Sequence, residues 1–258
     1  MENLFDLTNK VAIVTGGGLG LGRSNALALA KAGANVVIAD IVHENAQKVM
    51  EEIIDLGGNS ICVKVDITKK QELEEMVKKV VDFFNRIDVL VNSAGIPAPN
   101  NPRIPLVEMD EEKWDRVIEV NLKGTFLSNQ IVAKQMINQK NGRIINMASI
   151  SGIIGSRDAL GVGAYCASKA GVIMFTKALA LELLNYNITV NSISPGCMDT
   201  KFGGVRNPEA YNKKIKMIPI NRFGKPEELN GLVIYLASDN ASFITGSNII
   251  IDGGETLW

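Results

Sequence analysis

The sequence predicts an α/β fold, with one doubly wound parallel sheet of about seven strands and helices on both of its faces. Two observations predict it. Short apolar runs, long enough for strands buried on both faces, alternate with longer segments whose apolar residues recur at helical spacing. A glycine-rich turn and a small-residue helix join the first two strands. Because no linker or internal repeat interrupts this alternation, we expect residues 1–258 to form a single domain.

The individual elements follow from the same patterns. The expected strands are residues 11–14, 35–39, 60–65, 88–91, 142–147, 188–193 and 247–251. The expected helices are residues 26–32, 43–56, 73–84, 110–122 (with Asp110 as the cap) and 165–184. The last helix is apolar nearly all round, so it needs cover on more than its sheet side, either from the fold or from another subunit.

Composition excludes several classes of protein. The chain has 258 residues, 46% of them hydrophobic, and a net charge of −1, which gives no electrostatic footprint for nucleic acid. No apolar run reaches membrane-spanning length, and the first ten residues are too few and too polar for a signal peptide. Cys62, Cys166 and Cys197 lack metal-ligand spacing, so we expect a reducing cytoplasm and no metal site. The single histidine, His43, excludes mechanisms that need a histidine cluster.

The turn after the first strand is the strongest local signal. Residues 15–22 read TGGGLGLG, between an apolar strand and a small-residue helix. Glycines let a backbone turn sharply and approach a pyrophosphate, whose charge is stabilised by free N–H groups at the helix start. The spacing is looser than G-x-G-x-x-G, so a glycine-rich turn without function is the alternative.

Asp40 decides between the alternatives. It ends the second strand, 18 residues after Gly22. A carboxylate there accepts hydrogen bonds from the adenosine ribose hydroxyls of NAD and repels the 2′-phosphate of NADP. Asp40 could also be only a strand-end cap, but its place in the strand–helix–strand unit favours the ribose. The sequence therefore predicts NAD as the cofactor.

A second group of polar residues lies at the same edge of the predicted sheet. Asn92, Ser149 and the pair Pro195 and Gly196 follow strand ends, where open α/β sheets bind ligands. Tyr165 and Lys169 are four residues apart, hence on one helix face. A nearby ammonium favours the phenolate, so such a tyrosine can exchange a proton with an alcohol or carbonyl at neutral pH. A chance pair on a solvated face is the alternative.

Eight motifs in order along the chain resemble the classical short-chain dehydrogenase/reductase family from end to end. They are the glycine turn 15–22, Asp66 in DIT, NSAG at 92–95, Asn121 in NLKG, Ser149, YCASK at 165–169, PGCMDT at 195–200 and IDGG at 251–254. The resemblance implies a Rossmann-like fold, a nicotinamide cofactor, and interconversion of a secondary alcohol and a ketone.

The resemblance also implies roles for single residues. Tyr165 would be the general acid/base, Lys169 would hold the nicotinamide ribose and lower the tyrosine pKa, and Ser149 would bond the reacting oxygen. Asn121 would keep a proton-relay water, and Ser149, Ser151 and Tyr165 would face the substrate. With the glycine turn and Asp40, the implied cofactor-binding residues are Gly16, Gly18, Leu19, Gly20, Leu21, Gly22, Asp40, Ile41, Asp66, Ile67, Asn92, Ala94, Gly95, Tyr165, Lys169, Pro195, Gly196, Met198 and Thr200.

The chain departs from the family pattern in two respects. Ser93 stands where asparagine is commoner. Ser149 and Tyr165 are separated by 16 positions, about three more than usual. The extra length falls in the loop 155–163, which we expect to overhang the substrate, and Ser151 is the competing catalytic serine.

These observations favour an NAD-dependent oxidoreductase. Its expected substrate is a sugar, polyol or sugar acid, because Arg103, Arg157 and Asp158 lie in the pocket loops. The alternatives are a 3-oxoacyl-(acyl-carrier-protein) reductase, a subgroup that normally uses NADPH, and a non-catalytic NAD-binding regulator or scaffold. We further expect a substrate lid at about residues 197–225. The apolar helix 165–184, the strand 249–251, Trp258 and the resemblance together predict a homotetramer.

Overall fold

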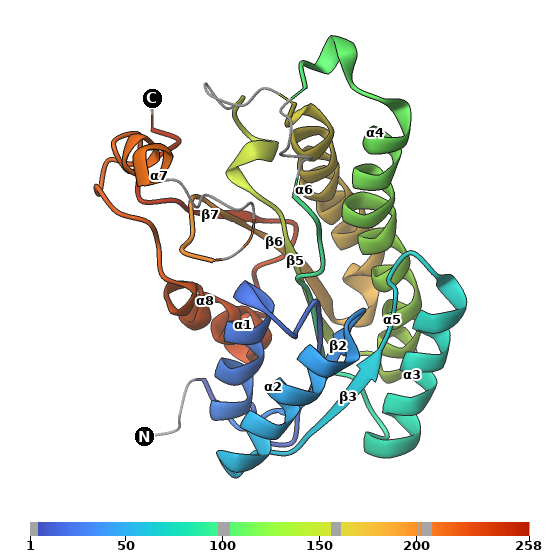
Figure 1. The fold of residues 1–258 in the computed structure, drawn as a ribbon. Helices are drawn as coiled ribbons and strands as arrows, with labels where there is room; N and C mark the ends of the chain where they lie inside the picture. The colour runs from blue at the N-terminus through green and yellow to red at the C-terminus, as the bar shows by residue number, and fades with distance from the viewer. Residues whose placement is uncertain (1–4, 98–103, 156–160, 201, 203–207, 258) are drawn as a thin grey trace.

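The computed structural model describes residues 5–97, 104–155, 161–200, 202 and 208–257. Seven parallel strands form one sheet in the order β3-β2-β1-β4-β5-β6-β7 (Figure 1). The strands are β1 (Val11–Thr15), β2 (Asn35–Asp40), β3 (Ser60–Lys64), β4 (Val89–Asn92), β5 (Gly142–Met147), β6 (Ile188–Pro195) and β7 (Asn248–Ile251). The chain crosses to the other half of the sheet after β3, which places a topological switch point between β1 and β4. The predicted doubly wound sheet is confirmed.

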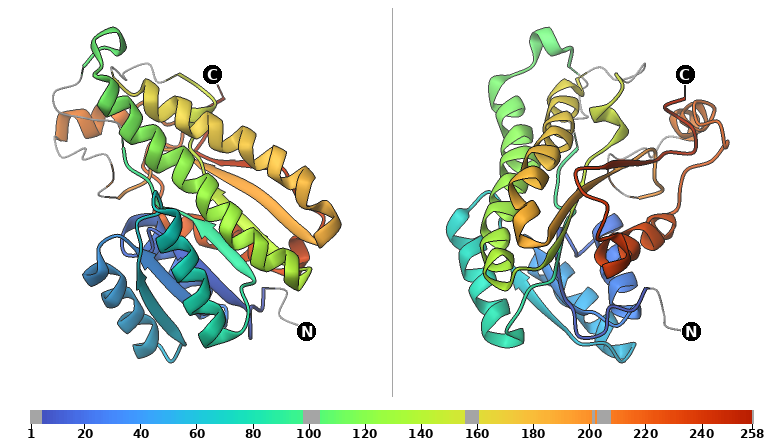
Figure 2. Two further views of the ribbon diagram at one scale, coloured as in Figure 1. Left: turned by 90° about the vertical axis from the view of Figure 1, so that its right-hand side faces the viewer. Right: turned by 180° about the vertical axis from the view of Figure 1, so that it is seen from behind.

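Helices cover both faces of this sheet. They are α1 (Gly20–Lys31), α2 (His43–Asp55), α3 (Lys70–Phe84), α4 (Glu111–Ile118), α5 (Thr125–Gln139), α6 (Gly163–Leu183), α7 (Pro208–Ile215) and α8 (Asn230–Ala237). One apolar core joins the sheet to α3, α5 and α6, which lie together in the left-hand view of Figure 2, and the other joins it to α1, α2 and α8. The central strands are buried on both faces, which explains their continuous apolar runs.

Four helical details differ from the prediction. The first helix begins at Gly20, inside the glycine turn, rather than near residue 26. Asp110 stands at the start of α4 but makes no capping bond, because its carboxylate pairs with Lys113 instead. The predicted helix 110–122 is longer and irregular: α4 runs into a π-helical turn, Glu119–Gly124, and then directly into α5. Helices α7 and α8 had no predicted counterpart.

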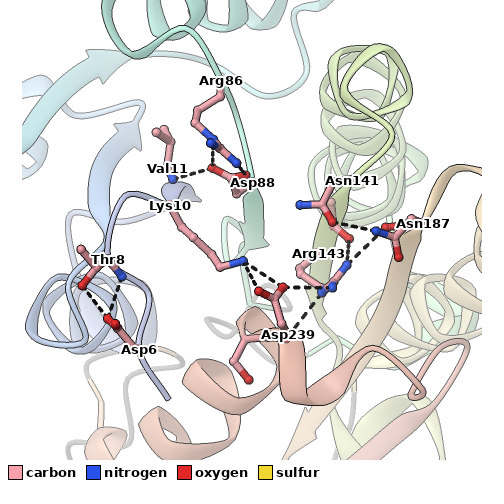
Figure 3. A network of polar contacts seen from close by, with 12 residues as sticks. Asp6, Thr8, Lys10, Val11, Arg86, Asp88, Asn141, Arg143, Asn187 and Asp239 are labelled. Atoms are coloured by element: carbon pink, nitrogen blue, oxygen red, sulfur yellow. Dashed lines mark hydrogen bonds and ion pairs between the residues drawn. The ribbon is translucent and has the colours of Figure 1, made fainter. Parts of the chain in front are cut away.

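Charged side chains join the elements at the amino ends of the central strands (Figure 3). Asp88 is 1% exposed; it accepts the backbone N–H of Val11 at 2.9 Å and pairs with Arg86. Arg143, 3% exposed, donates to the Asn187 carbonyl at 3.2 Å and pairs with Asp239, which also pairs with Lys10. This network fixes β1, β4, β5 and the chain after α8 at the edge opposite the strand carboxyl ends.

We expect Asp239→Asn to lower the free energy of unfolding by about 1–2 kcal/mol at neutral pH, measured by urea denaturation. The buried Arg143 guanidinium would keep only carbonyl acceptors. Lys10 and Arg143 lower the pKa of Asp239 in the folded protein, so this stabilisation is present above the unfolded pKa and is lost as the pH falls through the folded one. The wild type and the variant should therefore converge in stability in acid. The exposed Asp82→Asn is the control and should leave stability unchanged; a neutral effect of Asp239→Asn would contradict the role of the network.

Within the described ranges, no helix combines the length and the apolar character that crossing a membrane requires.

Candidate active site

The glycine turn is packed so closely that side chains are excluded from it. A Cβ on Gly22 would lie 2.1 Å from the Gly16 carbonyl oxygen, and one on Gly16 would lie 2.7 Å from the Cα of Ala94, after β4. Gly16 and Gly20 also have positive φ values of 62° and 54°. Helix α1 starts after Leu19 with no side-chain cap and no acidic residue in its first turn. Its N–H groups are thus available to an anion, as a pyrophosphate requires.

Asp40 braces this turn. Its Oδ2 accepts the Gly18 N–H and its Oδ1 accepts the Val42 N–H, both at 2.9 Å. A Cβ on Gly18 would lie 2.9 Å from the same Oδ2. The neighbouring Ile41 side chain is exposed. The carboxylate is therefore fixed beside the turn, a function beyond the ribose binding that the sequence predicts, with lone pairs left for a ribose hydroxyl.

Residues after β3 and β4 form the next part of the same edge. Asp66 accepts the Thr68 N–H and hydroxyl, at 2.9 and 2.8 Å, which shapes the turn into α3. Ile67 is buried against Gly124: a Cβ on Gly124 would lie 2.6 Å from the Cδ1 of Ile67. Gly95 is similarly restricted, since its Cβ would lie 3.2 Å from Asn121 Oδ1 and 3.7 Å from Lys169 Nζ. The structure thus brings the segment after β4 against two of the predicted catalytic residues.

Asn121 lies in the π-helical turn and is fully buried. Its amide bonds the backbone of Ile96 in both directions: Oδ1 accepts the N–H at 2.8 Å and Nδ2 donates to the carbonyl at 3.0 Å. Nδ2 also lies 3.3 Å from the Ser168 hydroxyl of α6. The Asn121 side chain therefore connects the segment after β4 to the helix that carries Tyr165 and Lys169.

Tyr165 and Lys169 stand in the first two turns of α6. The Lys169 Nζ donates to the Met147 carbonyl at 2.7 Å and lies 5.7 Å from the centre of the Tyr165 ring. Burial lowers the pKa of Lys169 to about 8. Burial also raises the pKa of Tyr165 to about 12, and the hydrogen bond with the Ser149 hydroxyl acts in the opposite direction. In this arrangement the ammonium does not offset the burial, so the predicted lowering of the tyrosine pKa is not found.

The structure distinguishes the two candidate serines. Ser149, 8% exposed, is hydrogen-bonded to the Tyr165 hydroxyl, and its Oγ also accepts the backbone N–H of Ser151 at 3.1 Å. Ser151 lies on the following short 3₁₀ helix, Ile150–Gly152. The interaction of Ser151 with Ser149 comes from its backbone N–H and not from its side chain. The geometry therefore favours Ser149 as the partner of Tyr165.

The segment after β6 passes over this edge towards the glycine turn. It begins at Gly196, whose N–H donates to the Ile251 carbonyl at 2.9 Å, and Met198 is bridged to Gly224. Thr200 reaches the turn, since its Cβ would lie 3.9 Å from a Cβ on Gly20. The Phe202 ring lies 6.2 Å from that of Tyr165. Phe202 therefore borders the site, and no local sequence pattern indicates this contact.

The remaining predictions concern the loops. Helix α7, at the upper left of Figure 1, belongs to the expected lid, which stays a prediction. The end of the 155–163 loop packs on the segment before α4: a Cβ on Gly161 would lie 2.6 Å from the Ile104 carbonyl oxygen. Arg103, Arg157 and Asp158 lie outside the described residues. The described residues contain no cluster of three or more His, Cys, Asp or Glu side chains that could hold a metal ion, and Cys62, Cys166 and Cys197 are free thiols.

Comparison with known proteins identifies the family. Residues 17–256 match a family model described as enoyl-(acyl carrier protein) reductase. The 3-oxoacyl-(acyl-carrier-protein) reductase of Thermotoga maritima is 43% identical over 251 residues, covering 97% of this chain and 99% of the relative. The NAD-dependent glycerol dehydrogenase of Listeria innocua is 40% identical over 254 residues, covering 98% and 96%. A gluconate 5-dehydrogenase from Burkholderia cenocepacia, solved with NADP and tartrate, superposes with a TM-score of 0.92 at 31% identity, covering 99% and 98%. The chain belongs to the short-chain dehydrogenase/reductase family of oxidoreductases.

We expect Ser149→Ala to reduce turnover by at least about 10²-fold, because the reacting oxygen and Tyr165 both lose a hydroxyl partner. Ser151→Ala keeps the backbone N–H that holds Ser149, so its effect should be small. Steady-state kinetics of both variants, with NADH affinity as the check on folding, measure this. The reverse ranking would assign the reacting oxygen to Ser151.

Proposed function

We propose that this protein is an NAD-dependent dehydrogenase that interconverts a secondary alcohol and a ketone. The observation that carries the proposal is the convergence of Tyr165, Ser149 and Lys169 at the carboxyl end of β5, beside the glycine turn. The side-chain-free cradle and the uncapped start of α1 fit a dinucleotide, held by Asp40, Asp66, Asn92 to Gly95 and Pro195 to Thr200. The nicotinamide supplies or accepts the hydride when it is bound.

The residues of the chain supply position and a proton. In the direction of oxidation, the Ser149 hydroxyl donates a hydrogen bond to the substrate oxygen. The Tyr165 phenolate accepts the proton of the substrate hydroxyl. The Lys169 ammonium, one helical turn away and bonded to the Met147 carbonyl, favours the phenolate. In the direction of reduction the same tyrosine returns the proton. Catalysis at neutral pH therefore requires that Lys169 offset the increase in the pKa of Tyr165 that burial causes.

The substrate class we propose is a sugar, polyol or sugar acid. Similarity to a glycerol dehydrogenase and to a gluconate 5-dehydrogenase supports it. The second candidate is reduction of a 3-oxoacyl-(acyl-carrier-protein), supported by the 43% identity to the Thermotoga maritima enzyme. A non-catalytic regulator would have no use for four residues with complementary catalytic roles. Retention of Asn121, Ser149, Tyr165 and Lys169 therefore disfavours that alternative.

An absorbance screen of nicotinamide reduction and oxidation tests the function. Sugars, polyols, sugar acids, hydroxysteroids and simple secondary alcohols are offered with NAD⁺, and a 3-oxoacyl thioester with NADH and NADPH. We expect turnover of a polyhydroxylated alcohol with NAD⁺. Tyr165→Phe is the control: it should bind NADH like the wild type and lose at least about 10²-fold of the activity. Turnover of the thioester alone would establish the second candidate, and NADH binding with no turnover of any substrate would favour the regulator.

Two substitutions of Asp40 separate its two functions. Asp40→Asn keeps an oxygen for the Gly18 N–H but removes the charge, so we expect it to accept NADPH while binding NADH more weakly. Asp40→Ala also loses the brace of the turn, and we expect NADH affinity to fall by about 10-fold or more. Fluorescence titration with both reduced cofactors measures this. Unchanged rejection of NADPH by both variants would show that Asp40 does not select the cofactor.

We also propose a homotetramer. Helices α5 and α6 lie side by side on the outer surface (Figure 2) and expose apolar side chains, with Met174 63% and Leu181 72% accessible. Ile250 of β7, together with Phe243 before the strand and Leu257 after it, is also exposed, and Trp258 lies outside the described residues. Two self-complementary contacts of this kind generate a dimer of dimers.

Light scattering at micromolar concentration should give four times the 27.9-kDa mass of the chain. Met174→Glu with Leu181→Glu should reduce the mass to that of a dimer, because charges would face each other across the α5–α6 contact. The exposed Lys48→Glu on α2, which packs on the opposite face of the sheet, is the control. A monomeric mass for the wild type would refute the assembly.

A further inference from the structure

A row of polar side chains crosses the buried sheet near its carboxyl edge. Strand pairing places Thr15 beside Asn92, Asn92 beside Asn146, Asn146 beside Ser192 and Ser192 beside Asn248. The first four are 3% exposed or less. Because these side chains are buried within a double-faced core, they require hydrogen-bond partners.

Asn146 is the centre of this row. Its Oδ1 accepts Nδ2 of Asn92 and Nδ2 of Asn129, each at 2.9 Å, and its own Nδ2 donates to the Thr176 hydroxyl at 3.0 Å. These three partners come from β4, α5 and α6. Asn129 also donates to the Thr125 carbonyl at 2.7 Å, while its fully buried Oδ1 has no hydrogen-bond partner among the described residues. Such an unpaired acceptor is unfavourable, so packing alone does not account for an asparagine there.

Helix α6 is attached to β5 at two points. Thr176 bonds Asn146, and Lys169 bonds the carbonyl of Met147, the next residue of the strand. Lys169 and Thr176 are seven residues apart, two helical turns along one face, and Tyr165 is one further turn towards the N-terminus. Because a helix and a strand are both stiff over this length, the first attachment determines where the Lys169 ammonium lies along the strand.

We propose that Asn146, held by Asn129 and Thr176, is a positioning residue for the reaction. It fixes α6 against β5 so that the Lys169 ammonium donates its hydrogen bond to the Met147 carbonyl and stays close to Tyr165. The proposal rests on the proposed function, which makes Lys169 and Tyr165 the reacting pair. On this proposal, Asn146, Asn129 and Thr176 affect the protonation of Lys169 and not only the stability of the fold.

The surroundings of Lys169 give this effect a direction. The Nζ is approached by Tyr165 on its own helix, the Met147 carbonyl of β5, and Gly95 after β4 with the Asn121 amide beside it. Tyr165 is the titratable group among these; the neighbouring Cys166 thiol acts on the pKa of Tyr165, whereas burial is what lowers the pKa of Lys169. A hydrogen bond to the charged form raises a lysine pKa, so loosening the carbonyl contact in a buried site lowers it.

The test is titration of Lys169 in the protein without added cofactor. Carbon NMR of labelled lysine side chains follows it, and Lys169→Met identifies the signal. We expect Thr176→Val, which keeps the shape of the side chain, and Asn129→Ala each to lower the Lys169 midpoint by at least about half a pH unit. Thr176→Ser restores the hydroxyl and should return the midpoint to the wild-type value.

Asn191→Ala is the matched control. Asn191, 1% exposed on β6, bonds the Ile244 carbonyl at 2.7 Å and the Ser247 N–H at 3.1 Å, away from α6. It should lower stability and leave the midpoint unchanged. Equal shifts in Asn191→Ala and Thr176→Val, or no shift in Thr176→Val, would overturn the proposal. If Asn129→Ala does not fold, the Thr176→Val and Thr176→Ser pair is sufficient.

A second measurement separates this inference from the proposed function. NADH affinity is followed against pH for the wild type and Thr176→Val, and we expect its alkaline decline to begin at lower pH in the variant. Coincident curves with normal binding would refute the positioning role alone. Failure of the wild type to bind NADH would refute the proposed function, and with it a role of Asn146 in the reaction.

Discussion

The hydrogen bond from the Lys169 ammonium to the Met147 carbonyl is the contact on which the arrangement of the site depends. A lysine 6% exposed is unfavourable unless its charge finds acceptors, and β5 provides one at 2.7 Å. The bond requires a strand end that leaves a carbonyl unpaired, a helix that begins beside it, and a neighbour as small as Gly95. These three conditions explain why the catalytic candidates gather where β4 and β5 end.

Two edges of the sheet have different functions. At the amino edge, Asp88, Arg143 and Asp239 connect elements with paired charges. At the carboxyl edge, uncharged asparagine, serine and threonine side chains connect the central strands to α5 and α6, and the charged Asp40, Asp66 and Lys169 bond backbone groups instead of one another. Charges that stabilise the fold are thus far from the group whose protonation matters for the proposed reaction, so they do not perturb the pKa of Tyr165 through short-range contacts.

The sequence predicted those features that depend on local patterns. Buried strands and the glycine turn have short-range signatures, so the seven strands and their parallel arrangement were predictable, whereas the order of the strands in the sheet was not predicted. The start of α1 at Gly20 was not predicted, because glycine disfavours helix. Residue identity also located Tyr165 and Lys169. It could not show that a backbone carbonyl holds the lysine, that burial dominates the tyrosine pKa, or that Phe202 stands beside the ring, because these depend on distances between separate segments.

The π-helical turn at Glu119–Gly124 has a consequence for how this chain tolerates change in length. It holds one residue more than an α-helical turn, and each residue of an α-helix rotates the chain by about 100°. Removing one residue there would let α4 and α5 join as a regular helix with all backbone bonds intact. Because the π-helical turn absorbs the extra residue, α4 and α5 would stay in phase and Leu127 and Ile131 would keep their places in the core, while the Asn121 side chain would be displaced from the Ile96 backbone. A deletion that makes this helix more regular would therefore preserve the fold and dismantle one wall of the site.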